Sequence, residues 1–81
     1  MHPLMTQIHG MSSGTFAGYI SDAWGDVEDY ETIDAIYNNF VSWAYLNSDM
    51  YLTRQKAWEV FSTSFSFQNV TGNHPELFGS I

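Results

Sequence analysis

Carboxylates are the side chains with the clearest chemical potential in this sequence, because most of them gather in one short stretch. The 81-residue chain has nine Asp and Glu residues against two Lys and Arg, and six of the nine acids lie between Asp22 and Asp34. Neighbouring carboxylates can exchange protons with a substrate when burial raises the pKa of one of them. Nothing in the sequence marks a desolvated acid in a cleft, so we expect solvated acids and a protein that is not an enzyme.

The same acids do not have the spacing of a metal site. With Asp26 in the first position of a calcium loop, the sixth position lacks glycine, and Tyr37 stands where a bidentate acid is needed. His2, His9 and His74 show no metal-binding spacing, and the chain has no cysteine. We therefore predict no metal and no other cofactor.

A possible nucleophile motif lies at residues 10–14, which read Gly-Met-Ser-Ser-Gly and match G-x-S-x-G. The serine elbow of that motif requires a large parallel sheet, and a chain of this length cannot build one. The only histidine far downstream is His74, and no aspartate lies close before it. Ser12 or Ser13 is better interpreted as a helix cap.

The charge balance argues against two classes of partner. The formal net charge is −7, and Arg54 and Lys56 are the only Lys and Arg residues available to neutralise phosphates. We therefore expect neither nucleic acid nor an anionic membrane surface to be a direct partner. The sequence has no apolar run long enough to span a bilayer, and its first ten residues do not read as a secretory signal. We expect a cytoplasmic protein.

The first predicted helix covers residues 12–24. Phe16, Ile20 and Trp24 recur every four residues, as on one face of an amphipathic helix, and Gly25 is placed to end it.

Glycines also recur every four residues in this region, at Gly10, Gly14 and Gly18. On a helix they would form a smooth strip that permits a close helix–helix contact, within the domain or across a homodimer. The alternative is a first helix that its glycines simply weaken.

The stretch 27–46 is predicted to be a long helix. Asp26 or Asp29 can serve as its N-cap, and acids in its first turn suit the positive end of the helix dipole. Its apolar side carries Ile33, Ile36, Tyr37, Phe40, Val41, Trp43 and Ala44. The side expected to face water carries Glu28, Glu31, Ala35, Asn38 and Ser42.

A third helix over 49–62 is predicted to run antiparallel to the second. Beyond Phe61 the alternation of Phe with Ser or Thr is typical of a half-buried strand, so residues 63–68 stay unassigned. Residues 69–72 are expected to form a loop, and 75–78 a last helical turn.

These elements predict one mostly α-helical domain over residues 1–81, a small three-helix fold with an antiparallel helical hairpin. The helix 12–24 is expected to pack across the hairpin, and residues 1–10 to form an irregular N-terminal arm or a strand. The alternative is an α+β fold with short strands near 15–20 and 61–68.

The acids at the start of the second helix define an acidic ridge, made of Asp26, Glu28, Asp29, Glu31 and Asp34. Three of them follow one another at three-residue intervals, a rise of about 4.5 Å per step on a helix. Such acids can simply satisfy the helix dipole and keep the protein in solution. They can equally be presented to a basic groove of another protein, where opposite charge raises the association rate. The candidate aromatic anchors beside them are Trp43, Trp58 and Phe78.

A short, acidic, cysteine-free and largely helical chain that reads Asp-Val-Glu-Asp-Tyr-Glu-Thr-Ile-Asp at a helix start resembles the small phage-encoded inhibitors of bacterial restriction and CRISPR systems. The resemblance covers overall character and residues 26–34. It implies a non-enzymatic inhibitor that imitates nucleic acid and occupies a basic, nucleic-acid-binding groove of a partner protein in the host cytoplasm. The chain differs from extreme DNA mimics because only 14% of its residues are charged. A local ridge beside an aromatic contact is therefore expected, rather than mimicry over the whole surface.

The alternative function is structural. A small subunit could oligomerise through exposed aromatic surface, with the acids serving only solubility and no inhibitory role.

Overall fold

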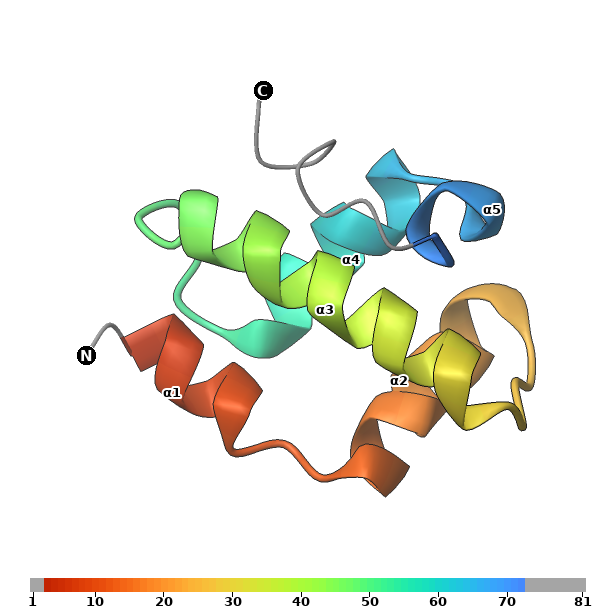
Figure 1. Cartoon of the computed structure of the whole chain (residues 1–81). Helices are drawn as coiled ribbons and strands as arrows, with labels where there is room; N and C mark the ends of the chain where they lie inside the picture. The colour runs from red at the N-terminus through yellow and green to blue at the C-terminus, as the bar shows by residue number, and fades with distance from the viewer. Residues whose placement is uncertain (1–2, 73–81) are drawn as a thin grey trace.

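The regular elements of the structure are helices. The computed structural model describes residues 3–72, and Figure 1 shows how the helices follow one another along the chain. They are α1 (Pro3–His9), α2 (Ser13–Trp24), α3 (Tyr30–Leu46), α4 (Arg54–Ser64) and α5 (Phe67–Val70). The described residues contain no strand, so the prediction of a mostly α-helical fold is confirmed and the α+β alternative is wrong.

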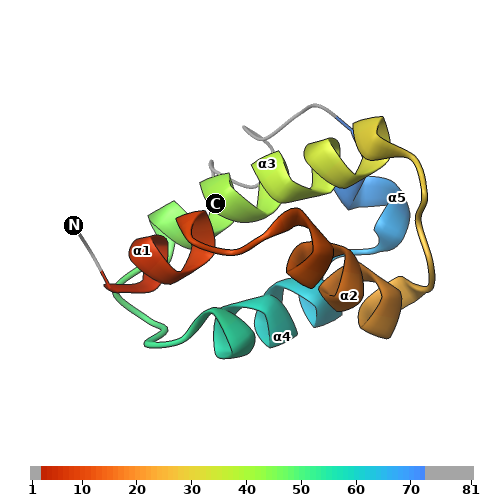
Figure 2. The same ribbon diagram turned by 90° about the horizontal axis from the view of Figure 1, so that it is seen from below.

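The longest helix, α3, runs through the middle of the molecule and contacts α1, α4 and α5. Figure 2 shows α4 running back alongside α3 in the opposite direction, which confirms the predicted helical hairpin. The backbone of α2 makes fewer close contacts with the other helices. Aromatic rings instead fill the space between α2 and its neighbours and keep the backbone of α2 at a distance from α3 and α4.

Side-chain caps fix where the three longest helices begin. Ser12, Asp29 and Thr53 each accept a hydrogen bond from the backbone N–H three residues later, at 3.1, 2.9 and 3.2 Å respectively. Such caps satisfy donors that the first turn of a helix leaves unpaired. At the other end of α2, Gly25 has φ +105°, a conformation that favours glycine. Ser12, Asp29 and Gly25 thus have the roles that the sequence predicts for them.

The core is built from aromatic rings packed between α2, α3 and α4. The fully buried Phe40 lies 5.1 Å from Trp58 and 5.2 Å from Phe61, measured between ring centroids. Phe16 brings α2 into the same cluster, at 5.3 Å from Trp58 and 6.1 Å from Phe40. Aromatic contacts of this kind add to the free energy gained by burying apolar area. Leu4, Ile8, Ile20, Ile36 and Val70 complete the centre of this core.

The expected irregular arm at residues 1–10 is wrong, because residues 3–9 form α1. Leu4, Met5 and Ile8 are buried against the rest of the molecule. Their spacing is that of a short helical stripe, and Pro3 is tolerated because the first residue of a helix needs no N–H partner. Docking on α3 and α4 holds a helix that is too short to be stable alone.

The end of the described chain also differs from the prediction. The stretch in which Phe alternates with Ser is not a strand. Instead, α4 ends at Ser64 and Ser66 caps the short α5. The Asn39 side chain donates hydrogen bonds to the carbonyls of Val70 at 2.9 Å and Gly72 at 2.7 Å, which fixes α5 on α3. One turn before Asn39, Ala35 is buried rather than facing water as predicted. The predicted turn at 75–78 lies outside the described residues.

Candidate binding surface

All five acids of the acidic ridge are exposed around the start of α3. The predicted helix start at residue 27 is wrong, because Asp29 caps a helix that begins at Tyr30. Asp26 and Glu28 therefore lie in the connection between α2 and α3, and only Glu31 and Asp34 lie on the helix. The ridge is a cluster that surrounds a helix start rather than a row along one helix.

Hydrogen bonds hold two of these carboxylates in place. The Ser21 hydroxyl donates to Asp26 at 2.6 Å, which ties the end of α2 to the connection. The hydroxyl and the backbone N–H of Thr32 both donate to Asp29, and these two bonds lower the pKa of that carboxyl below 3.8. Asp29 therefore has a structural role as a cap as well as a charge on the surface.

The two basic side chains of the chain are engaged elsewhere. Arg54 donates to the Tyr19 hydroxyl at 3.2 Å and to the Gln7 carbonyl at 3.1 Å. Lys56 pairs with Glu59 on its own helix at 3.4 Å. Within residues 3–72, no ridge acid forms an ion pair, so its charge is left for water or for a partner.

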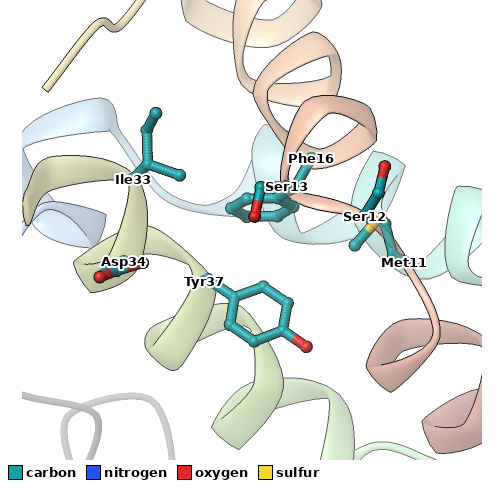
Figure 3. Close-up of a pocket in the computed structure, with 7 residues that line it drawn as sticks. All are labelled: Met11, Ser12, Ser13, Phe16, Ile33, Asp34 and Tyr37. Carbon is teal, nitrogen blue, oxygen red and sulfur yellow. The ribbon is translucent and has the colours of Figure 1, made fainter. Parts of the chain in front are cut away.

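A groove runs between α2 and α3 beside the ridge. It consists of two adjoining hollows of about 250 and about 360 Å³, and Ser13, Ile33 and Asp34 line both. Figure 3 shows the first hollow, with the Phe16 ring between the helices, Ser13 on the α2 side and Tyr37 on the α3 side. The second hollow is lined by Gly14, Ala17, Val27, Glu28 and Tyr30 in addition to the three shared residues. We call this feature the α2–α3 groove.

The α2–α3 groove exists because the large ring of Phe16 spaces α2 from α3, while the other residues of α2 that line the groove are small. Phe16 packs edge-on against Tyr37, with ring centroids 5.2 Å apart. The Tyr37 hydroxyl donates to the Ile8 carbonyl at 3.3 Å, and burial raises the pKa of this tyrosine above 10.0. A Cβ added at Gly14 would meet no atom within 4 Å, so this part of the groove is open to solvent.

The glycine strip does not make the predicted contact within the domain. A Cβ at Gly18, as at Gly14, would have no neighbour within 4 Å, and both glycines are exposed. No helix of the described chain packs on them. The homodimer form of the hypothesis stays a prediction.

The predicted aromatic anchors are wrong for both tryptophans. Trp43 is 4% exposed and Trp58 is 7% exposed, because the small core uses both indoles as filling. Phe78 lies outside the described residues. The exposed aromatic beside the groove is Tyr30, 77% exposed, which the sequence analysis missed. It could have been found from its position between two acids and off the apolar stripe of the helix.

A second surface feature lies at the far end of α3. Exposed apolar side chains cluster in sequence around the turn into α4 and define the α3–α4 apolar patch: Tyr45, Leu46, Met50 and Leu52. The Gln7 side chain anchors this turn to α1, because its amide donates to the Leu52 carbonyl at 2.9 Å.

The structure gives the serine motif a capping role and brings no set of metal ligands together in the described residues. The hydroxyl of Ser12, the serine of the elbow motif, donates to the Thr15 hydroxyl at 2.9 Å as part of the helix cap. Among residues 3–72, no three His, Asp or Glu side chains come together as metal ligands. Over the same range, no helix has the length and apolar content that crossing a bilayer requires.

Comparisons with protein-family models, with curated proteins and with solved structures give no match to this chain.

Proposed function

We propose that this protein is a non-enzymatic, protein-binding inhibitor whose acidic ridge occupies a basic, nucleic-acid-binding groove of its partner. The observation that carries the proposal is the exposure of all five ridge acids together with the lack of any ion pair to them within residues 3–72. Carboxylates left in this state attract a cationic surface over about 10 Å at moderate salt.

The charge is local, and this shapes the proposed mode of action. The ridge occupies the α2–α3 connection and the start of α3, whereas Arg54 and Lys56 both lie on α4. The carboxylates around the α2–α3 connection thus imitate a short run of phosphates, while the two basic side chains lie on another helix. A phage inhibitor of restriction or CRISPR proteins, acting in the host cytoplasm, needs only such a local charged surface to occupy one groove of its target.

The test is a charge reversal with a matched control. Glu28, Glu31 and Asp34 are changed together to Lys, and the control changes Asp22, Asp49 and Glu59 to Lys, so that both variants gain the same net charge. Each protein is immobilised and exposed to a bacterial lysate at low and then high salt, and captured proteins are identified by mass spectrometry.

The wild-type protein and the control are expected to retain a nucleic-acid-binding protein that high salt or added duplex DNA or RNA releases, because phosphates and carboxylates compete for the same cations. The ridge variant is expected to lose it. Equal capture by the ridge variant, or capture that nucleic acid does not displace, would contradict the proposal.

The α3–α4 apolar patch favours a second candidate function, self-association as a structural subunit. Leu52 is 81% exposed and Met50 is 69% exposed, and neighbouring apolar side chains of this kind often mark interfaces. Sedimentation at two ionic strengths separates the candidates. A homo-oligomer that persists at high salt and is lost in Leu52→Ser supports the second function, whereas a monomer in both conditions rejects it.

A further inference from the structure

The α2–α3 groove combines an apolar floor with an acidic rim. The apolar floor lies in the second hollow, where Val27 and Ile33 are half-buried, while the nearly fully buried Phe16 closes the first hollow from below. Glu28 and Asp34 stand at its edge, exposed. A ligand that lies here meets hydrocarbon below and carboxylates beside it.

We propose that the α2–α3 groove receives a basic amphipathic segment of the partner protein, with an apolar side chain in the groove and Lys or Arg side chains against Glu28 and Asp34. This inference rests on the proposed function and specifies the part of the partner that the acidic ridge recognises. The apolar face of such a segment contacts the apolar lining of the groove, and its basic face contacts the carboxylates at the rim.

Charge complementarity selects a cationic segment. The basic side chains of the chain are held on α4 by Tyr19, Gln7 and Glu59, so none compensates the rim acids within residues 3–72. An anionic segment would be repelled by the same acids. The exposed ring of Tyr30 at the rim adds a face over which a Lys or Arg cation can lie.

The size and openness of the hollows favour a peptide over a small molecule. A cavity of roughly 150 Å³ holds a benzene-sized group, so the hollows of about 250 and about 360 Å³ can each take an apolar side chain. Small-molecule sites bury most of their ligand. Here Ser13, Gly14 and Tyr30 are exposed linings, and a small ligand would keep much of its surface in water.

Two glycines on α2 provide a matched pair for the test. Gly14 lines the groove, whereas Gly18 lies one turn later and does not. Both are exposed, helical and free of any atom within 4 Å of an added Cβ. Leucine is tolerated at both positions because it is a good helix former that meets no neighbour, so Gly14→Leu and Gly18→Leu are both expected to fold.

The probes are two synthetic peptides of equal length and equal lysine number. One carries Lys on one helical face and Leu on the other, and the second has Ser in place of every Leu. Binding is followed by calorimetry and by the backbone amide signals of the full chain. We expect the Lys-Leu peptide to bind roughly tenfold more tightly than the Lys-Ser peptide, with signals moving at Gly14, Ala17 and Ile33.

Gly14→Leu is expected to weaken binding of the Lys-Leu peptide by at least about tenfold, and Gly18→Leu by no more than about twofold, because only the first fills the groove. Equal effects of the two variants, equal binding of the two peptides, or signal changes centred on the α3–α4 apolar patch would each overturn the inference. Circular dichroism of both variants verifies that they are folded.

The outcomes also separate this inference from the proposed function. If the ridge variant loses its nucleic-acid-binding partner while Gly14→Leu keeps it, the groove does not bind the partner segment, and the proposed contact through the acidic ridge is supported. If both variants keep the partner, both proposals are wrong.

Discussion

At the start of α3 most exposed side chains are carboxylates, with Tyr30 among them, whereas the exposed side chains at its end and in the turn that follows include Tyr45, Leu46 and Met50. Both ends belong to one helix whose middle is fixed in the core by Phe40. The difference arises because acids occupy the connection before the helix and its first turns, whereas exposed apolar residues occur in its last turn and in the connection after it. Binding at the first end should depend strongly on salt, and binding at the second should not.

Damage to the middle of α3 should affect both ends of the helix at once. Phe40→Ala is expected to lower the free energy of unfolding by about 3–5 kcal/mol, because it removes a fully buried ring and leaves a cavity. Both ends of the helix should then lose their structure together. Urea unfolding measures the change, and Tyr45→Ala, at a 68% exposed position, is the control that should shift stability by less than about 0.5 kcal/mol.

Loss of a helix cap should have a smaller effect on stability than loss of Phe40, and this effect should be local to α2 or to α4. Ser12→Ala and Thr53→Ala each remove an N-cap and are expected to cost about 1 kcal/mol. Amide hydrogen exchange should show the first loosening α2 beside the groove and the second loosening α4 beside the apolar patch. Identical protection patterns in the two variants would show that the two sides unfold as one unit.

Two glycine replacements test the backbone conformation and the open surface of α2 beside the groove. Gly18→Ala is expected to raise the free energy of unfolding by about 0.5–1 kcal/mol, because alanine is the better helix former and meets open space. Gly25→Ala should lower it, since φ is +105° at that position. Thermal unfolding of the two variants gives the signs, and a loss of stability in Gly18→Ala would contradict the open surface on α2.

The smallest effect concerns the charge of the Asp29 cap, which is fully exposed. Hydrogen bonds from Thr32 lower its folded pKa below the ordinary value of 3.8. A depressed carboxyl pKa stabilises the fold above the unfolded pKa, and this contribution is lost as the pH falls through the folded value. The melting temperature of wild-type protein should therefore decrease more steeply below pH 3.8 than that of Asp29→Asn, which keeps a capping side chain without the charge. Parallel pH profiles would show that the charge of the cap does not matter.

Much of the fold could be predicted because helix signals are local. The spacing of Phe16, Ile20 and Trp24 indicates α2, and Gly25 marks its end. The helix α1 was not predicted because a short stripe next to a proline and a histidine gives a weak period, and the stability of this helix comes from docking. The short α5 was missed for a similar reason, since Asn39 holds it through contacts more than 30 residues away in sequence.

The candidate site was predicted only in part. Acid clustering in the sequence located the ridge, and the structure shows all five acids exposed. The choice of Trp43 and Trp58 as anchors was wrong because aromatic type alone does not distinguish a core ring from a surface ring. The α2–α3 groove has no sequence signal, because it depends on how far one ring separates two helices.

The sequence by itself determined that helices lie near residues 12–24, 27–46 and 49–62, that Ser12 and Asp29 can cap two of them, and where the negative charge lies, because each of these depends on neighbours within a few positions along the chain. Tertiary structure alone decided which aromatic rings are buried, which glycines face open space and that Tyr30 stands beside a groove. These properties depend on the distances between helices, and such distances are set by side chains from segments far apart in the sequence.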